Sequence, residues 1–202
     1  ESTVIPALAD CGIRYVIVDD YHFLCAGKPS SELHGYFSTE EDGRKLDLFP
    51  ISEILRYKIP FSPVAETIAY LESLADSASS SCAAAIYFDD IEKFGIWPET
   101  YQWVYEKGWL EQFIQSVLAS SKICTQHYGE YHASEKTRGI VYLPTVSYIE
   151  MNEWTLPAQA ANTYAELVQQ AKINSWYEHK KAFLRGGIWK NFFSRYPESN
   201  WM

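Results

Sequence analysis

Four short runs of almost continuously apolar residues constrain the fold of this chain more than any other feature. They are "YVIVDD", "AAIYFDD", "SKICTQH" and "IVYLPTVSY", at residues 15–20, 84–90, 121–127 and 140–148. Strands covered on both faces carry such runs, whereas half-exposed strands alternate apolar and polar residues. We therefore expect four strands in a sheet that is covered on both sides.

Helical patterns lie between and after these runs. Apolar residues recur at helical spacing over 64–75 and 109–118, and a third helical stretch covers 158–171. Alternating strands and helices indicate right-handed β-α units and a parallel sheet. Four parallel strands cannot close a barrel, and an open sheet of this kind would leave long edges exposed. The sequence therefore predicts an α/β fold that forms the later part of a larger (β/α) barrel with parallel strands.

Two parts are expected along the chain. Residues 1–157 would form a partial (β/α) barrel catalytic domain, and residues 158–202 a helical segment leading out of the barrel. The stretch 35–50 looks like a hairpin that turns at Asp42-Gly43, inserted between the first two strands. The chain opens "ESTVIPALAD", with neither Met nor a signal-peptide pattern, so we expect an internal part of a longer protein.

Composition excludes several classes of partner. A formal net charge of −9 argues against binding to a nucleic-acid backbone, which needs a surplus of Lys and Arg. No apolar stretch approaches the ~20 residues of a membrane span. The four cysteines are scattered without a C-x-x-C pair, which favours a reducing, cytoplasmic location. His127 and His132 are five residues apart, off the spacing of a helical metal pair, and we expect neither a metal nor another cofactor.

Ionisable side chains follow three of the apolar runs. Parallel strands carry their functional sites at their carboxyl ends, so side chains at three such ends should meet at one face. The alternative is that these polar side chains form no site and only cap strands and helices. The side chains concerned are Asp19, Asp20 and His22, then Asp89, Asp90 and Glu92, and finally Tyr148, Glu150 and Glu153.

Three functions suit such a set of carboxylates. Glycoside cleavage needs one acid to protonate the leaving oxygen and one carboxylate to attack or to activate water. Metal-assisted hydrolysis would use Asp and His as ligands. A catalytically silent carbohydrate-binding surface would use the same polar groups with Trp platforms. Trp97, Tyr101 and Trp103 follow the Asp pair and favour a sugar ligand over a phosphate.

The sequence around these residues resembles a known family. "FDDIEKFGIWPETYQWVYEKGWLEQF" (88–113) is similar to the signature of glycoside hydrolase family 57. "YVIVDDYHF" (15–23), "YLPTVSYIEMNEWTLP" (142–157) and "RGGIWKNFFSRYPESNWM" (185–202) resemble further stretches of that family, in the same order. The resemblance points most to the branch of 4-α-glucanotransferases and α-amylases, and leaves transfer and hydrolysis both open.

The resemblance implies a retaining mechanism on a (β/α)₇ barrel, with α-glucans or maltooligosaccharides as substrates. Asp90 would be the acid/base residue and Trp97 would contact sugar, with Asp20, His22 and Glu150 as candidates for hydrogen bonds to substrate. The family's glutamate nucleophile would lie a few residues upstream of this chain. We therefore expect the 202-residue piece alone to be inactive.

Two positions depart from the family pattern. Ile91 stands where relatives usually carry a small residue, and Glu99 where glycine is usual. β-Branched residues tolerate positive φ poorly, so the loop backbone is expected to differ here. The alternative interpretation is a catalytically inactive, carbohydrate-binding relative. Because side chains alternate along a strand, Asp89 and Asp90 should point in opposite directions, one into the cleft and the other towards backbone or a basic group. The resemblance implies that Asp90 is the one that faces the cleft.

Overall fold

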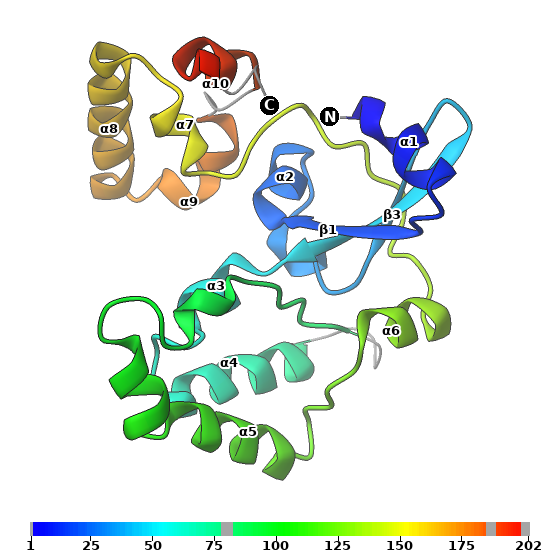
Figure 1. Cartoon of the computed structure of the whole chain (residues 1–202), viewed down its shortest axis with the longest axis vertical. Coiled ribbons are helices and arrows are strands. Elements are labelled where there is room, and N and C mark those ends of the chain that lie inside the picture. The colour runs from blue at the N-terminus through cyan, green and yellow to red at the C-terminus, as the bar shows by residue number, and fades with distance from the viewer. Residues whose placement is uncertain (1, 78–82, 185–188, 199–202) are drawn as a thin grey trace.

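A single mixed sheet lies at the centre of the computed structural model, which describes residues 2–77, 83–184 and 189–198. Its three strands are β1 (Tyr15–Asp19), β2 (Phe37–Glu41) and β3 (Arg44–Ile51), in the order β1-β3-β2 (Figure 1). Strand β3 pairs in parallel with β1 and antiparallel with β2. The parallel β1–β3 pair brings the carboxyl ends of both strands to the same edge.

The predicted hairpin is present, but it belongs to the sheet. Glu41 lies opposite Arg44, so the chain reverses at Asp42 and Gly43. Both turn residues have positive φ, 50° and 73°, as the two-residue turns that match strand twist require. Its second strand, β3, is the central strand of the sheet, so the hairpin of 35–50 supplies two of the three strands.

The prediction of four parallel strands is wrong. Within the described residues, 84–88 and 122–125 form no strand, and 140–143 contributes only an isolated parallel bridge between Ile140 and Ser38. Ala84 N–H donates to the His34 carbonyl (3.3 Å) and the Ile86 carbonyl accepts from Ser52 N–H (2.9 Å), which falls short of a ladder. A continuous apolar run does not encode hydrogen-bond partners, and 122–125 is not buried either, since Lys122, Cys124 and Thr125 are exposed. The described residues therefore show a small mixed sheet, and not a (β/α)₇ barrel.

Both faces of the sheet are covered, as the apolar runs predicted. Successive side chains of a strand point to opposite faces. On one face, Val16 and Val18 of β1 pack with Leu46 and Leu48 of β3 in a core that includes Phe23. This core also takes side chains from α1 (Ile5–Asp10) and α2 (Asp20–Cys25). The other face packs against α6 (Tyr128–Ser134), and its core contains Tyr15, Ile17, Phe49, Tyr128 and Tyr131.

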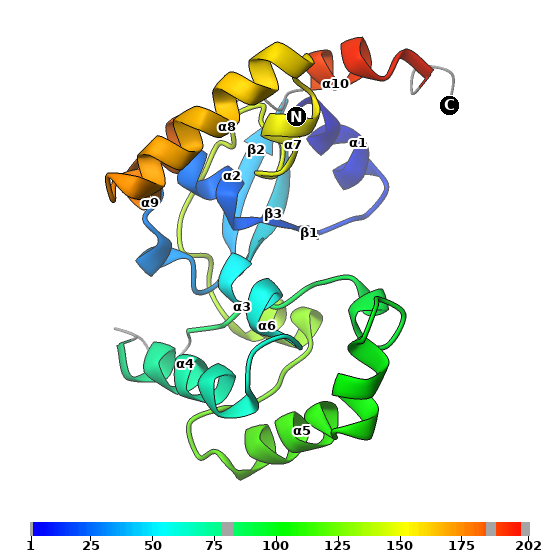
Figure 2. The same cartoon turned by 90° about the vertical axis from the view of Figure 1, so that its left-hand side faces the viewer.

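A group of helices extends beyond the carboxyl end of β3 (Figure 2). They are α3 (Glu53–Lys58), α4 (Val64–Ser77) and α5 (Trp109–Ala119), and the last two confirm the helical patterns of the sequence. They share a third core around the buried Leu55, Ile59 and Trp109. A 3-10 helix at Ile91–Lys93 and a π-helix at Gln102–Glu106 lie in the chain between α4 and α5.

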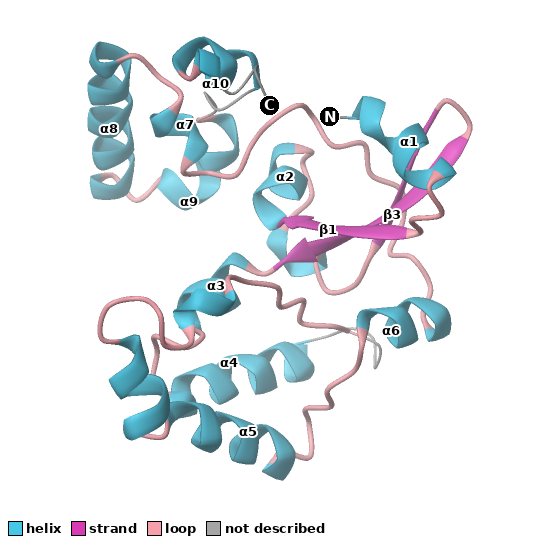
Figure 3. Cartoon of the chain, viewed as in Figure 1, coloured by secondary structure: helices cyan, strands magenta, loops and turns pink. Residues whose placement is uncertain are grey.

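The last part of the described chain is helical (Figure 3). It contains α7 (Met151–Trp154), α8 (Ala158–Ile173), α9 (Tyr177–Lys180) and α10 (Trp189–Arg195). Short 3-10 helices occupy Ser2–Val4, Ser30–Glu32 and Lys181–Phe183. A domain boundary at 157 stays a prediction. Residues 185–188 and 199–202 of the fourth family-like stretch lie outside the described residues. Among the described helices, none is long and apolar enough to cross a membrane.

Candidate active site

The carboxyl end of β1 supplies the first group of polar side chains. Asp19 ends the strand and caps α2, because its Oδ1 accepts a hydrogen bond from Tyr21 N–H at 3.0 Å. The ring nitrogen Nδ1 of His22 lies 3.2 Å from the Asp19 carbonyl oxygen. Burial raises the pKa of Asp19 and lowers the pKa of His22, so the neutral imidazole is favoured.

Asp20 faces the start of α3. Its Oδ2 accepts a hydrogen bond from Glu53 N–H at 3.1 Å, whereas Oδ1 is buried with no hydrogen-bond partner among the described residues. Burial raises the pKa of this carboxyl to about 7. Asp20 therefore joins the carboxyl ends of β1 and β3 by holding the first turn of α3.

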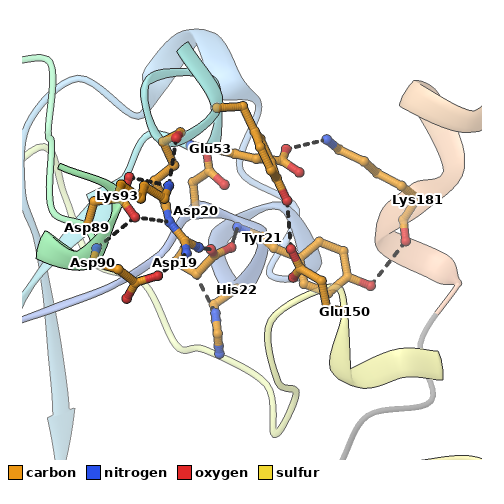
Figure 4. Close-up of polar contacts among 12 residues, drawn as sticks. Asp19, Asp20, Tyr21, His22, Glu53, Asp89, Asp90, Lys93, Glu150 and Lys181 are labelled. Atoms are coloured by element: carbon orange, nitrogen blue, oxygen red, sulfur yellow. Dashed lines mark hydrogen bonds and ion pairs between the residues drawn. The ribbon is translucent and has the colours of Figure 1, made fainter. Parts of the chain in front are cut away.

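Asp89 and Asp90 have opposite environments, although they are neighbours in sequence (Figure 4). The Asp89 side chain is 1% exposed, and its Oδ2 lies 2.6 Å from Lys93 Nζ. Its Oδ1 accepts from Arg56 Nε at 3.3 Å and from Asp90 N–H at 2.9 Å. The Asp90 side chain is 54% exposed, and the Nη2 atom of Arg56 lies 4.0 Å from its Oδ2. Asp89 thus makes the ties to basic groups that were expected, while the catalytic role of Asp90 stays a prediction.

Arg56 and Lys93 lie at the site, although neither was among the predicted site residues. Lys93 is four residues after Asp89, and that spacing is a signal for a local ion pair. Arg56 contacts Asp19 and Asp89 across 37 and 33 residues of chain. No local pattern reports such a contact, because the fold alone brings α3 beside the 83–90 segment.

Trp97 lies on the surface near Lys93. Its ring stacks on Phe61, with 6.0 Å between centroids and 18° between planes, and Lys93 Nζ lies 5.6 Å from each centroid. Trp97 is 40% exposed and keeps part of its surface open. Glu99 has a left-handed backbone with φ of 64°, a conformation that glycine adopts without a steric penalty. Ile91 instead belongs to a regular 3-10 turn and is 80% exposed.

Glu150 precedes α7 and approaches α3 from the third predicted strand end. Its Oε1 accepts a hydrogen bond from Tyr57 O–H at 2.6 Å. The pKa of Tyr148 is raised by burial first, then by the charges of Glu150 and Asp90, while Arg56 opposes the rise. Ionisable side chains that follow β1, 83–88 and 140–143 therefore lie together around α3, although only the first of these three segments is a strand.

The described residues contain no group of three or more His, Cys, Asp or Glu side chains that could hold a metal ion. His132 instead lies 2.8 Å from Oδ2 of the buried Asp47, whose Oδ1 accepts from Ser38 Oγ at 2.7 Å. A metal-dependent hydrolase, the third interpretation of the sequence, thus has no ligand set in this part of the chain.

The chain is similar to known proteins over nearly its whole length. A family model described as glycosyl hydrolase family 57 matches residues 1–144. The chain is 50% identical over 199 residues to a 4-alpha-glucanotransferase of Thermococcus litoralis, and equally to an alpha-amylase of Pyrococcus furiosus. Each match covers 98% of this chain and 30% of the relative. The crystal structure of 4-alpha-glucanotransferase from Thermococcus litoralis matches with a TM-score of 0.92 and 49% identity, over 99% of this chain and 31% of that one. The chain spans about 30% of the length of the curated relatives it matches.

Proposed function

Because this chain belongs to glycosyl hydrolase family 57, we propose that it contributes the general acid/base to a retaining enzyme that cleaves α-1,4-glucosidic bonds. The substrate class would be α-glucans or maltooligosaccharides, and the glycosyl unit would pass to another glucan or to water. Two relatives at 50% identity, one named a 4-alpha-glucanotransferase and one an alpha-amylase, support this substrate class.

The contrast between the two aspartates carries the assignment. A general acid must reach the glycosidic oxygen and must exchange its proton with the reacting groups. Asp89 is enclosed and bound to Lys93 and Arg56, so its oxygens are already occupied. Asp90 is half-exposed and binds neither cation closely. In this proposal Asp90 gives its proton to the leaving oxygen while a nucleophilic carboxylate outside the described residues bonds to the sugar carbon. Asp90 then takes a proton from the acceptor hydroxyl or water as that oxygen displaces the carboxylate.

Trp97 would bind a sugar ring on the part of its indole that stays open, with Phe61 supporting it. His22 in its neutral form can both donate and accept hydrogen bonds, which suits sugar hydroxyls. Glu150 would accept from a hydroxyl beside Tyr57. The contacts of Asp20 favour a supporting role, because one oxygen holds α3 and the other is buried.

A catalytically inactive carbohydrate-binding protein is the second candidate, and Ile91 is the observation that favours it. This large side chain is 80% exposed and follows Asp90 directly. It could occupy space that a sugar needs in order to reach the carboxyl group. The same aromatic surface would then bind glucan without turnover.

A cytoplasmic location without nucleic-acid partners remains part of the proposal. Cys11 and Cys124 are free thiols within the described ranges, which suits a reducing compartment. The excess of 26 acidic over 17 basic residues disfavours binding to a phosphate backbone.

Substitution of Asp90 by Asn in the full-length protein tests the proposed chemistry. We expect kcat on maltooligosaccharides to fall by ~10²–10⁴-fold, the usual loss of a general acid, while the fold survives. An aryl maltooligoside with a good leaving group should keep far more of its kcat/KM, since its departure needs little protonation. The matched control is Asp89→Asn, for which we expect mainly a loss of stability. If Asp89→Asn is folded and inactive while Asp90→Asn is active, the acid is assigned to the wrong residue.

A further inference from the structure

One guanidinium group meets three carboxylates at the candidate site. Arg56 of α3 lies 3.3 Å from Asp19 through Nη1, 3.3 Å from Asp89 through Nε, and 4.0 Å from Asp90 through Nη2. The side chain is 27% exposed, so water screens these contacts only in part. Arg56 therefore links the end of β1 to both aspartates that end the 83–90 segment.

Arg56 is also fixed through its backbone. Lys93 Nζ donates to the Arg56 carbonyl at 2.8 Å and to Asp89 Oδ2 at 2.6 Å. The helix that carries Arg56 is capped by Ser52, whose Oγ accepts from Leu55 N–H at 3.3 Å, and Leu55 is 1% exposed. The guanidinium thus extends from a backbone with little freedom to move.

The link from Arg56 to Asp90 passes through one oxygen atom. Asp89 Oδ1 accepts both Arg56 Nε at 3.3 Å and the backbone N–H of Asp90 at 2.9 Å. A change in the position of the Asp89 carboxylate therefore changes the position of the Asp90 peptide. The planar guanidinium of Arg56, with its fork of N–H donors, holds the Asp89 carboxylate and Asp19 together. A lysine ammonium has no such rigid planar fork and could not replace it.

We propose that Arg56 is a positioning residue for Asp90, which it holds in place through Asp89 Oδ1. The inference rests on the proposed function, because it takes Asp90 as the general acid. The contribution is one of orientation, and a displacement of about 1 Å can cost ~10²-fold in rate. Arg56 needs no contact with the substrate for this role.

Two variants and two substrates test the role. Arg56→Gln removes the charge and most of the fork, and Arg56→Lys keeps the charge without the fork. For both we expect kcat/KM on maltooligosaccharide to fall by ~10–10²-fold. On an aryl maltooligoside with a good leaving group we expect a fall of less than ~3-fold, because the first step then needs little help from a placed acid. A variant that only loosens the fold would lower both values alike.

The matched control is Arg44→Gln, which removes an exposed guanidinium bound to Asp10 at 2.7 Å, and both rate constants should stay as in the wild type. Thermal unfolding of each variant shows that it is folded at the assay temperature. Equal losses on the two substrates, or wild-type behaviour of Arg56→Lys, would overturn the positioning role. Asp90→Asn in the same assay separates the two proposals: if it lacks the leaving-group-dependent loss, the proposed function itself fails.

Discussion

Asp20 shows how burial changes the behaviour of one residue. One oxygen accepts from Glu53 N–H, and the other has no partner among the described residues. Burial disfavours the charged form and raises the pKa of the carboxyl to about 7. In an unfolded chain the same group has a pKa of about 3.9. The folded protein therefore binds more protons than the unfolded chain between these two values.

Stability should consequently fall as pH rises from about 4 towards 7 through this group. A difference of about three pKa units corresponds to about 4 kcal/mol as an upper bound. Asp20→Asn carries no titrating group at this position. The melting temperature of this variant minus that of the wild type should therefore increase as pH rises from 5 to 8. The exposed Asp42→Asn variant corrects for the loss of one negative charge. A gap between Asp20→Asn and wild type that stays constant with pH would contradict the assignment.

At the scale of elements, a buried ion pair joins a three-residue 3-10 helix to its surroundings. Within Ile91–Lys93, Lys93 N–H donates to the Asp90 carbonyl at 3.4 Å, and the Ile91 carbonyl accepts from Phe94 N–H at 3.0 Å. Its last residue, Lys93, is 4% exposed and binds Asp89, which is 1% exposed. The same ammonium binds the α3 backbone, so it joins two elements that are distant in sequence.

Lys93→Met should therefore destabilise the protein strongly, by ~3 kcal/mol, because a buried carboxylate loses its closest cation. The free energy of unfolding in urea measures the loss. Lys122→Met is the control, since Lys122 Nζ lies 2.7 Å from Asp76 in a pair whose side chains are 46% and 63% exposed. We expect a much smaller loss there, because water already solvates both partners. Similar losses for the two variants would show that the Lys93–Asp89 contact is unimportant for stability.

For the whole molecule, a few polar contacts attach the last helices to the sheet. Figures 1 and 2 place α7, α8 and α9 on the opposite side of α3 from α4 and α5. Lys181 binds Glu53 at 2.9 Å. The hydroxyl of the buried Tyr21 donates to the carbonyls of Lys181 at 3.2 Å and Leu184 at 3.3 Å, and it accepts from Asn152 Nδ2 at 3.2 Å. Tyr21 thus connects α2 to the segments on both sides of α8.

Tyr21→Phe should loosen this attachment and leave the sheet intact. Loss of a buried hydroxyl with several partners costs ~1–3 kcal/mol. We expect amide hydrogen exchange to become faster in α8, while β1 and β3 keep their protection. Tyr142→Phe, at a tyrosine that is 62% exposed, should leave both regions unchanged. Equal loss of protection in α8 and in β3 would mean that the two parts unfold together, contrary to this prediction.

The sequence by itself determined the features that depend on neighbouring residues. The turn at Asp42-Gly43 follows from residues that accept positive φ, and helices α4 and α5 follow from apolar spacing within a dozen residues. The continuous run 15–19 correctly predicted a strand, whose five residues are partly buried and whose apolar side chains pack into cores on both faces of the sheet. The family likewise followed from long contiguous stretches such as 88–113.

Only the tertiary structure decided which segments pair and which charges meet. The run at 84–88 is as apolar as β1, yet it forms no strand among the described residues, because strand formation needs a partner that the run does not encode. β3 became the central strand although it was assigned to an insertion. Arg56 reaches Asp19 and Asp89 from 37 and 33 residues away. Local sequence sets side-chain periodicity and turn geometry, whereas a contact across tens of residues depends on how the whole chain packs.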